Sequence, residues 1–516
     1  MARAPNKWLV TVAVSFGTLM GAIDASIVNV AIPHMQGALG ASIDEITWVS
    51  TGFIVANVIM MPVVAWLGRR MGRKNVYQAC MVLFVAGSFF CGTARTLWTL
   101  VFFRVLQGLG AGGLQPTEQA ILRETFPVHE QATAMSVFGL AVMLGPAVGP
   151  TLGGWIVDNF SWPWIFYVNL PVGAVGLLMV QRFVKDPDFL VAGRSQARSE
   201  QIDYFGLLLL SVGLFCVQLL LERGDRDGWW SSHLIQSLAF GGGFCLALFV
   251  VRELSIDHPI VDLSILKYRS YSAGTFIGAV LGVSLFGSLF MLPLFFQDML
   301  GLSAMQSGLD LMPRTLAMMV SMPIAAWLFN RLGARLLISV GLCVGGVAAF
   351  SMSHFTLQSS TYDVVLPQIV QGIGFSLIFV ALSTAALARV PRERMSAATG
   401  LYNLMRNLGG SVGTVTIAVL FERAVVRAYG VLAAHIMPAR VIVQERLAAI
   451  GAFLRGQTGS DAGAIAMLAG EVQKQATVIA FERCFAIIGF IFFLSLPLVF
   501  LIENIKPGRG HKLEVE

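Results

Sequence analysis

Charged residues are scarce in this chain. They make up 12% of the 516 residues, while 56% of the residues are hydrophobic, whereas a soluble domain carries about 25% charged residues. No stretch within the first 420 residues has the composition of a soluble domain. The composition therefore excludes a soluble globular protein and indicates an integral membrane protein.

Cysteine is sparse as well, and several sequence motifs of enzymes are missing. The six cysteines stand singly, without a Cys-x-x-Cys pair, so neither a disulfide framework nor a zinc site is expected. The chain lacks a Gly-Lys dipeptide, which excludes a Walker A loop, and it lacks His-Glu-x-x-His. We expect no enzyme activity, no cofactor and no bound metal, so that any transport would draw on an ion gradient.

The net charge of +6 does not indicate a nucleic-acid partner, because the Lys and Arg residues lie in short loops between apolar runs. The first apolar run starts at Trp8 and contains Asp24. It lasts about 23 residues, enough to cross a bilayer and longer than the core of a signal peptide. We therefore expect it to be a retained first transmembrane helix.

Apolar runs of about 20 residues, the length that a helix needs to cross the hydrocarbon core, recur along the chain. They predict an all-α membrane protein with fourteen transmembrane helices, at 8–32, 46–67, 76–94, 98–121, 133–157, 163–183, 204–221, 234–252, 273–297, 305–329, 336–354, 364–388, 396–420 and 484–503. Lys and Arg concentrate in the short loops on the side of the termini, which the positive-inside rule assigns to the cytoplasm. We expect a multi-pass protein of the bacterial inner membrane with both termini cytoplasmic.

Two stretches of the first half return in the second half. AWLGRRMGRK (Ala65–Lys74) returns 261 residues later as AWLFNRLGAR (Ala326–Arg335), and VLQGLG (Val105–Gly110) returns 264 residues later as IVQGIG (Ile369–Gly374). Two halves that run in the same direction are typical of a transporter that rocks about a central site.

The repeat also predicts the domain organisation. Residues 1–183 and 253–516 are each expected to form a six-helix bundle, and the two bundles are expected to be related by pseudo-twofold symmetry. Residues 184–252 are left over as a linker and an inserted hairpin of two helices. The only sizeable segment outside the membrane is 421–483, on the periplasmic side, which forms either a small helical cap or a loosely ordered loop.

Six charged residues lie in the interior of the predicted spans, away from the last two residues at either end. There each costs about 2.5–3.5 kcal/mol, and a function is the default explanation. They are Asp24, Arg104, Glu118, Asp310, Arg314 and Arg406. A carboxylate in a low-dielectric site can take up and release protons near neutral pH, so Asp24, Glu118 and Asp310 are candidate proton-coupling residues. The alternatives are a structural hydrogen bond for Asp24 and a solvated helix end for Glu118.

The arginines in the spans also have more than one explanation. Arg104 stays charged when buried, so it either tunes a nearby carboxylate or orders the first half through a salt bridge. Arg314 lies four residues after Asp310 on one helix face, so the two form either a self-neutralised pair or a switch that opens on protonation. A polar face of span 396–420 carries Asn403, Arg406 and Asn407. We expect this face to line a cavity or to hydrogen-bond between the halves.

Glycines recur every four residues in the predicted span 133–157, with prolines between them. The run comprises Gly145, Pro146, Gly149, Pro150, Gly153 and Gly154. Small residues at this spacing let helix backbones approach closely, and prolines bend a helix. We expect a tight, kinked helix against span 234–252 or span 396–420 that shapes a gate or hinge; the alternative is ordinary close packing.

Three of these segments resemble the motifs of one transporter family. They are AIDASIVNVAIP (Ala22–Pro33), FRVLQGLGAGG (Phe103–Gly113) and GLAVMLGPAVGPTLGG (Gly139–Gly154). The chain is similar to the major facilitator superfamily, and within it to the fourteen-span drug:proton antiporters of the EmrB/QacA type, with EmrB-like permease subunits the closest. The resemblance implies the major facilitator fold, with Asp24 as the acid of the first-helix motif and Arg104 as the arginine of the fourth-span motif.

One loop departs from the family pattern, which normally begins Gly-x-Leu-x-Asp-Arg. Here Ala65 replaces the glycine and Arg69 replaces the acid, so a charge relay through an acid of this loop is in doubt. The loop residues are Arg69, Arg70, Gly72 and Arg73. The positive charges in this loop are expected to anchor the cytoplasmic side.

The resemblance also implies a function and partners. An EmrB-like protein would export hydrophobic or amphipathic compounds while protons enter, by alternating access and without a cofactor. A periplasmic membrane-fusion adaptor and an outer-membrane channel would be its partners, with segment 421–483 as a docking site. The alternatives are an exporter of one specific metabolite, such as a siderophore or an amino acid, and a membrane sensor that does not transport.

Overall fold

The computed structural model describes residues 6–188, 190–191, 203–256, 259–359, 361–437, 440–455 and 461–503, and these residues form helices and their connections without a β-strand. Residues 192–202 of the expected linker lie outside these ranges. The helices of the first half are α1 (Lys7–Leu39), α2 (Ile43–Ile46), α3 (Trp48–Met71), α4 (Arg73–Thr93), α5 (Leu97–Thr125), α6 (Gln131–Asn159), α7 (Trp164–Tyr167) and α8 (Asn169–Phe183). The remaining helices are α10 (Tyr204–Arg223), α11 (His233–Ser255), α12 (Arg269–Leu294), α13 (Ala304–Leu332), α14 (Ala334–Met352), α15 (Thr361–Ala386), α16 (Met395–His435), α17 (Val441–Arg455), α18 (Asp461–Leu494) and α19 (Leu496–Val499).

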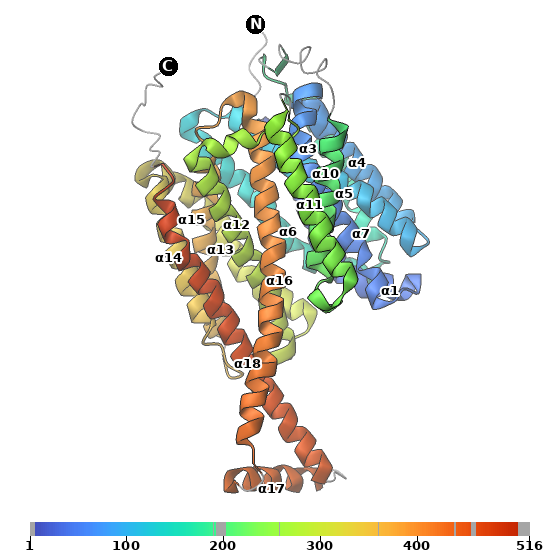
Figure 1. Ribbon diagram of the computed structural model, residues 1–516, viewed down its shortest axis with the longest axis vertical. Helices are drawn as coiled ribbons and strands as arrows, with labels where there is room; N and C mark the ends of the chain where they lie inside the picture. Colours follow the sequence, from blue (N-terminus) through green and yellow to red (C-terminus); the bar gives the residue numbers. More distant parts are fainter. Residues whose placement is uncertain are drawn as a thin grey trace.

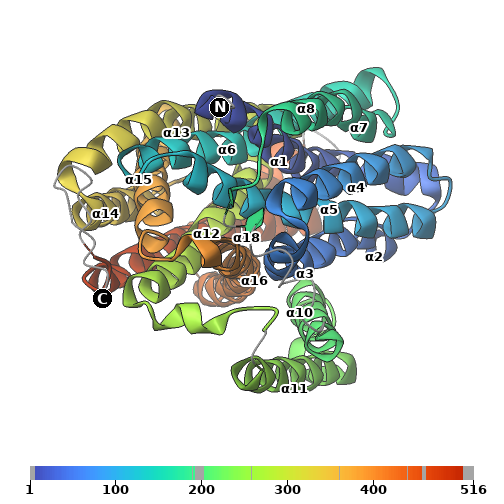
Figure 2. The same ribbon diagram turned by 90° about the horizontal axis from the view of Figure 1, so that it is seen from above.

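The helices form two bundles that lie side by side. Figure 2 shows the first half, in blue and teal, beside the second half, in yellow to red, with the pair α10–α11 outside them. The helix α10 packs against α3 and α16 and so joins the edge of both bundles. The predicted all-α architecture with an inserted hairpin is therefore present.

The interface between the halves has the symmetry of the sequence repeat. The repeat relates α3 to α13 and α6 to α16. The most extensive packing between the halves joins α6 to α13 and α3 to α16. Exchanging each helix for its counterpart in the repeat turns the contact between α6 and α13 into the contact between α16 and α3. This exchange is expected when two bundles are related by a pseudo-twofold axis.

Thirteen helices in the described part of the chain are long and apolar enough to cross a membrane. They cover every predicted span except 396–420, which lies in the 41-residue helix α16. The first turns of this helix carry the buried polar residues Asn403 and Arg406. It nevertheless runs through the bundle between α12, α18 and α3, so its polar side chains are enclosed by protein rather than by lipid.

A glycine with a positive φ angle ends the first helix and precedes the second at each of the two repeated loops. Gly72 (φ 89°) lies between α3 and α4, and Gly333 (φ 85°) lies between α13 and α14. Since a side chain strains the backbone at positive φ, both loops need glycine. The two positions are 261 residues apart, so the repeat is preserved in backbone conformation as well as in sequence.

A helical projection extends from one end of the bundles (Figure 1). The long helices α16 and α18 extend past the other helices, and α17 lies across their tips. We call this the α17 end, and the opposite end, where α1 begins and α15 ends, the terminal end. Segment 421–483, for which a helical cap and a loose loop were the alternatives, is helical in its described part; residues 438–439 and 456–460 lie outside the described ranges.

Candidate functional site

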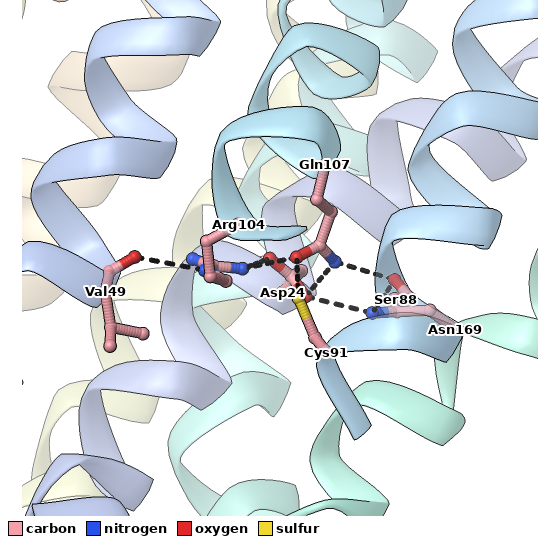
Figure 3. A network of polar contacts seen from close by, with 7 residues as sticks. All are labelled: Asp24, Val49, Ser88, Cys91, Arg104, Gln107 and Asn169. Carbon is pink, nitrogen blue, oxygen red and sulfur yellow. Dashed lines mark hydrogen bonds and ion pairs between the residues drawn. The ribbon is translucent and has the colours of Figure 1, made fainter. Parts of the chain in front are cut away.

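A closed network of polar side chains surrounds Asp24 in the first half (Figure 3). The Asp24 carboxylate is fully buried and accepts hydrogen bonds from Arg104 Nη1 (2.6 Å), Gln107 Nε2 (2.8 Å) and Asn169 Nδ2 (2.9 Å). Arg104 and Gln107 also bond to each other, at 2.7 Å. The Ser88 hydroxyl accepts from Gln107 at 2.6 Å and from Asn169 at 3.3 Å. The network therefore ties α1, α4, α5 and α8 together around one buried ion pair.

Arg104 is the member of this network that reaches the centre of the protein. Its Nε donates to the Val49 carbonyl oxygen at 3.2 Å, and its guanidinium lies 4.1 Å from the centroid of the Phe53 ring. These contacts join α5 to α3. A cation over an aromatic face is favourable where water is excluded, so the guanidinium is held by an acid on one side and a ring on the other.

A cavity of about 490 Å³ lies between the halves, next to Arg104. Its wall is built from α1, α3, α5 and α6 of the first half, from α10 of the hairpin, and from α12, α13 and α16 of the second half. The charged residues in the wall are Arg104, Glu222 and Arg314, and most of the remaining surface is apolar. A mostly apolar cavity with a few fixed polar groups is the usual form of a small-molecule site.

Glu118 occupies a second polar site between α1 and α5. Its side chain is fully buried, and it accepts a hydrogen bond from the Ser15 hydroxyl at 3.1 Å. The hydroxyl of Thr18, a residue of the cavity wall, lies beside it. No ion pair reaches Glu118 from the described residues. The alternative of a solvated helix end is therefore wrong, because the Glu118 carboxylate is fully buried. Thr18 of the cavity wall separates it from the cavity.

Three residues of α5, four positions apart, link the two halves on the terminal-end side of the cavity. They are Gln115, Gln119 and Arg123. Their partners in the second half are Arg406 Nη2 (2.9 Å), Asn403 Nδ2 (2.8 Å) and the backbone oxygen of Thr384 (2.9 Å). Residues spaced by four share one helix face, so α5 presents a stripe of hydrogen bonds to α16 and α15. We call these three residues the α5 stripe.

The predicted hydrogen bonding of Arg406 and Asn403 between the halves is present in this stripe. Asn407, the residue that follows Arg406 in α16, lines the cavity, and its Nδ2 contacts Met61 Sδ at 3.3 Å. All three polar residues of α16 therefore contact the first half, and Asn407 also lines the cavity.

The expected ion pair between Asp310 and Arg314 is absent from the described residues. Arg314 is buried in the cavity wall and donates to Gln371 Oε1 at 3.4 Å. Asp310 is half-buried, and its backbone oxygen accepts a hydrogen bond from Gln368. Spacing by four placed both on the same side of α13, which continues as a helix through Pro313, but the arginine reaches across to Gln371 of α15 instead.

The glycine run of α6 packs closely, but against a helix that the sequence did not indicate. A Cβ atom on Gly145 would overlap the backbone of Ala22, and one on Gly149 would overlap the Ser26 side chain, so the close partner is α1 of the same half. The expectation of a contact with span 234–252 or 396–420 is wrong for these glycines. Gly154 faces open space and takes no part in the close approach. A gating role for the run stays a prediction.

The repeated loop at the terminal end is held by an acid from another helix. Arg73 is buried, forms an ion pair with Glu124 of α5, and donates to the Arg392 carbonyl oxygen at 3.1 Å. Arg69 donates to the Pro259 carbonyl oxygen at 2.9 Å. Arg73 is thus a buried interface residue rather than a surface anchor. The loop has no acid at position 69, and its Arg73 is paired instead with Glu124, an acid of α5 that sequence analysis missed.

Sequence analysis also missed the neutral members of the central network. Gln107, Ser88 and Asn169 carry no charge, so a search for charged residues in apolar runs passed over them. One signal was available, because Gln107 is part of VLQGLG and returns as Gln371 in IVQGIG. In the described part of the chain, no cluster of three or more His, Cys, Asp and Glu residues could hold a metal ion.

Comparison with sequence families places these features in a known group. The family model of the Major Facilitator Superfamily matches residues 14–414. The chain is 34% identical to the multidrug export protein EmrB of Haemophilus influenzae over 504 residues, which cover 97% of this chain and 96% of that protein. It is 32% identical to the fatty acid resistance protein FarB of Neisseria gonorrhoeae, with 97% of each protein covered.

Solved structures share the fold. The proton:xylose symporter XylE aligns with a TM-score of 0.63 at 13% identity, covering 96% of this chain and 95% of XylE. The human organic anion transporter MFSD10 aligns with a TM-score of 0.61 at 13% identity, covering 96% of this chain and all of that chain. At this identity the likeness establishes the arrangement of helices alone.

Proposed function

This chain belongs to the Major Facilitator Superfamily, and from that premise we propose that it exports hydrophobic and amphipathic compounds across the bacterial inner membrane in exchange for protons. The observation that carries the proposal is the cavity between the halves, with a buried acid–arginine pair and a second buried acid directly behind its wall. The similarity to multidrug export proteins supports the substrate class.

The positive-inside rule assigns the terminal end to the cytoplasm and the α17 end to the periplasm. On α5 the cavity wall ends at Gln115, which is the first residue of the α5 stripe. From there to the terminal end, hydrogen bonds of the stripe join the halves. We infer that the structure represents a state closed toward the cytoplasm, and that the stripe separates when the two bundles rock to the opposite state.

Proton coupling would use the acids behind the cavity wall. Asp24 reaches the cavity through Arg104, and Glu118 reaches it through Thr18. Substrate that enters the cavity can therefore alter the contacts of either acid without touching it. A proton that enters the cell down a potential of 100 mV releases about 2.3 kcal/mol, and a pH gradient adds to this driving force.

The proposal is tested with purified protein in liposomes that contain a fluorescent amphipathic dye. An imposed pH gradient should drive dye transport, and dye added without a gradient should drive proton movement in the opposite direction. If neither flux appears in protein that is folded and inserted, the antiporter proposal is wrong, and a membrane sensor that uses the same fold becomes the better explanation.

The helix α17 is proposed as part of the docking site for a periplasmic membrane-fusion adaptor. It lies across the tips of α16 and α18, and Arg446 of α17 forms an ion pair with Glu471 of α18 at 2.8 Å, which fixes it to the projecting helices. Apolar side chains on this projection are exposed, including Val441, Ile442 and Ile465. An exposed apolar surface outside the membrane is typical of an interaction site.

Replacing residues 441–455 with a flexible Gly-Ser linker should abolish co-purification of a co-expressed, tagged adaptor and leave membrane insertion unchanged. Arg446→Gln, which removes only the ion pair, is the milder matched variant and should weaken co-purification. Full retention of the adaptor by the linker variant would show that it docks elsewhere.

A further inference from the structure

The cavity wall contains a buried guanidinium without a bound carboxylate. Arg314 is 2% exposed and lines the cavity from α13. Its hydrogen bond to Gln371 is 3.4 Å long, and its Nε has no partner. In the described chain no ion pair involves this arginine. A buried cation that lacks a counter-ion is costly unless something else supplies the negative charge.

The repeat provides a comparison within the same molecule. Gln371 is the counterpart of Gln107, since the two repeated segments align without a gap. In the first half, Gln107 binds both Arg104 and Asp24. In the second half, Gln371 binds Arg314 and donates to a serine hydroxyl at 3.1 Å. Among the described residues, the second half therefore has a glutamine bound to an arginine but no acid beside them. This arginine comes from α13, since the counterpart of Arg104 in the repeat is Gln368.

The other charges in the wall do not compensate for this. The guanidinium of Arg104 is already paired with Asp24 at 2.6 Å. Glu222 lies exposed in the last turn of α10, near the α17 end, and the ion pairs of the described residues do not join it to Arg314. As far as the described residues show, the cavity consequently offers one positive charge without a counter-ion, that of Arg314 on the wall of the second half.

The remaining wall suits an apolar chain. Phe53 and Leu114 face the cavity from the first half, and Phe286, Leu289 and Met318 face it from the second. The arginine thus stands at one place in a surface that is otherwise mostly hydrophobic. This combination fits a ligand with one acidic group and an apolar body.

We propose that Arg314 binds the acidic group of an amphipathic anion, such as a long-chain carboxylate, and so completes the polar network of the second half with an acid that the substrate brings. This inference rests on the proposed transport function, since it assigns a substrate class to the same cavity. A guanidinium–carboxylate contact is charge-assisted and can be bidentate, which makes it selective for the ionised acid over an ester of the same length.

The test measures binding of a dansyl-labelled long-chain fatty acid and of its methyl ester to the purified full-length protein in detergent. The wild type should bind the acid at least about tenfold more tightly than the ester, and Arg314→Gln should lose this preference while its affinity for the ester is unchanged. Arg314→Lys should retain part of the preference because it retains the charge. Arg331→Gln, in the same helix but stacked on Trp327 away from the cavity, is the matched control and should behave as the wild type.

Two outcomes would overturn the inference. One is a wild-type protein that binds ester and acid equally, a result that does not depend on whether any variant folds. The other is a folded Arg314→Gln protein that keeps the full preference for the acid. Because binding in detergent needs no proton gradient, failure of gradient-driven dye transport would refute the antiporter proposal and leave the acid preference to be judged separately.

Discussion

Asp24→Asn should reduce pH-gradient-driven efflux at least about tenfold while the protein still inserts into the membrane. Asparagine has nearly the same shape but cannot take up a proton, and it removes the negative partner of Arg104, whose Nη1 lies 2.6 Å from the carboxylate. Removing one partner of a buried ion pair typically costs about 3–5 kcal/mol. We therefore expect the temperature of thermal unfolding to fall as well. Dye efflux from proteoliposomes and unfolding of the purified protein measure the two effects.

A double variant separates coupling from stability. In Asp24→Asn/Arg104→Gln both charges are gone, so much of the lost stability should return. If efflux stays low in this stable protein, the acid is needed for transport itself. If efflux recovers together with stability, Asp24 is only a structural partner of Arg104, and its proposed role in proton coupling is wrong.

Glu118→Gln should have the opposite signature. No ion pair reaches this buried carboxylate from the described residues, and its hydrogen bond from the Ser15 hydroxyl can also be made to an amide oxygen. Stability should thus stay the same or rise, because the cost of burying an unpaired charge is removed. Proton release on addition of dye, measured in weakly buffered detergent solution, should be lost, and efflux should no longer respond to the pH gradient.

The matched control for this variant is Glu130→Gln. Glu130 forms an ion pair with Lys7 at the terminal end and is partly exposed, far from the cavity wall. The Glu130→Gln protein should release protons when dye binds, as the wild-type protein does. Normal proton release from Glu118→Gln would assign the coupling proton to another group, with Asp24 the remaining candidate in the first half.

The helical architecture could be predicted from the sequence because the bilayer imposes it. Runs of about 20 apolar residues must be helices in a membrane, and thirteen helices of the described chain meet that criterion. The repeat predicted the two halves, and the same register reappears in the paired glycines Gly72 and Gly333 and in the exchanged contacts between the halves. The apolar run 396–420 likewise predicted the first part of α16, although this helix continues to His435.

The candidate site was predicted less completely. Charge in an apolar run marked Asp24, Arg104 and Arg314, because such residues are costly in lipid and must be enclosed. The neutral partners Gln107 and Asn169 have no charge, so the search for charged residues in apolar runs did not identify them. Helical spacing suggested that Asp310 and Arg314 pair, yet spacing gives only a shared face, and the partner on the neighbouring helix decided the contact.

The sequence by itself determined that this chain lies in a membrane, that it has two related halves, and which charges must be shielded, since all three follow from hydration energies and from the repeat. Only the tertiary structure decided which charges meet. It paired Asp24 with Arg104, placed Glu118 beside the Ser15 hydroxyl and joined Arg73 to Glu124. Among the residues that the structure describes, it left Arg314 in the cavity wall without an acid. The physical reason is that ion pairs and hydrogen bonds act over about 3 Å, and contacts of that length between distant segments depend on how the helices pack.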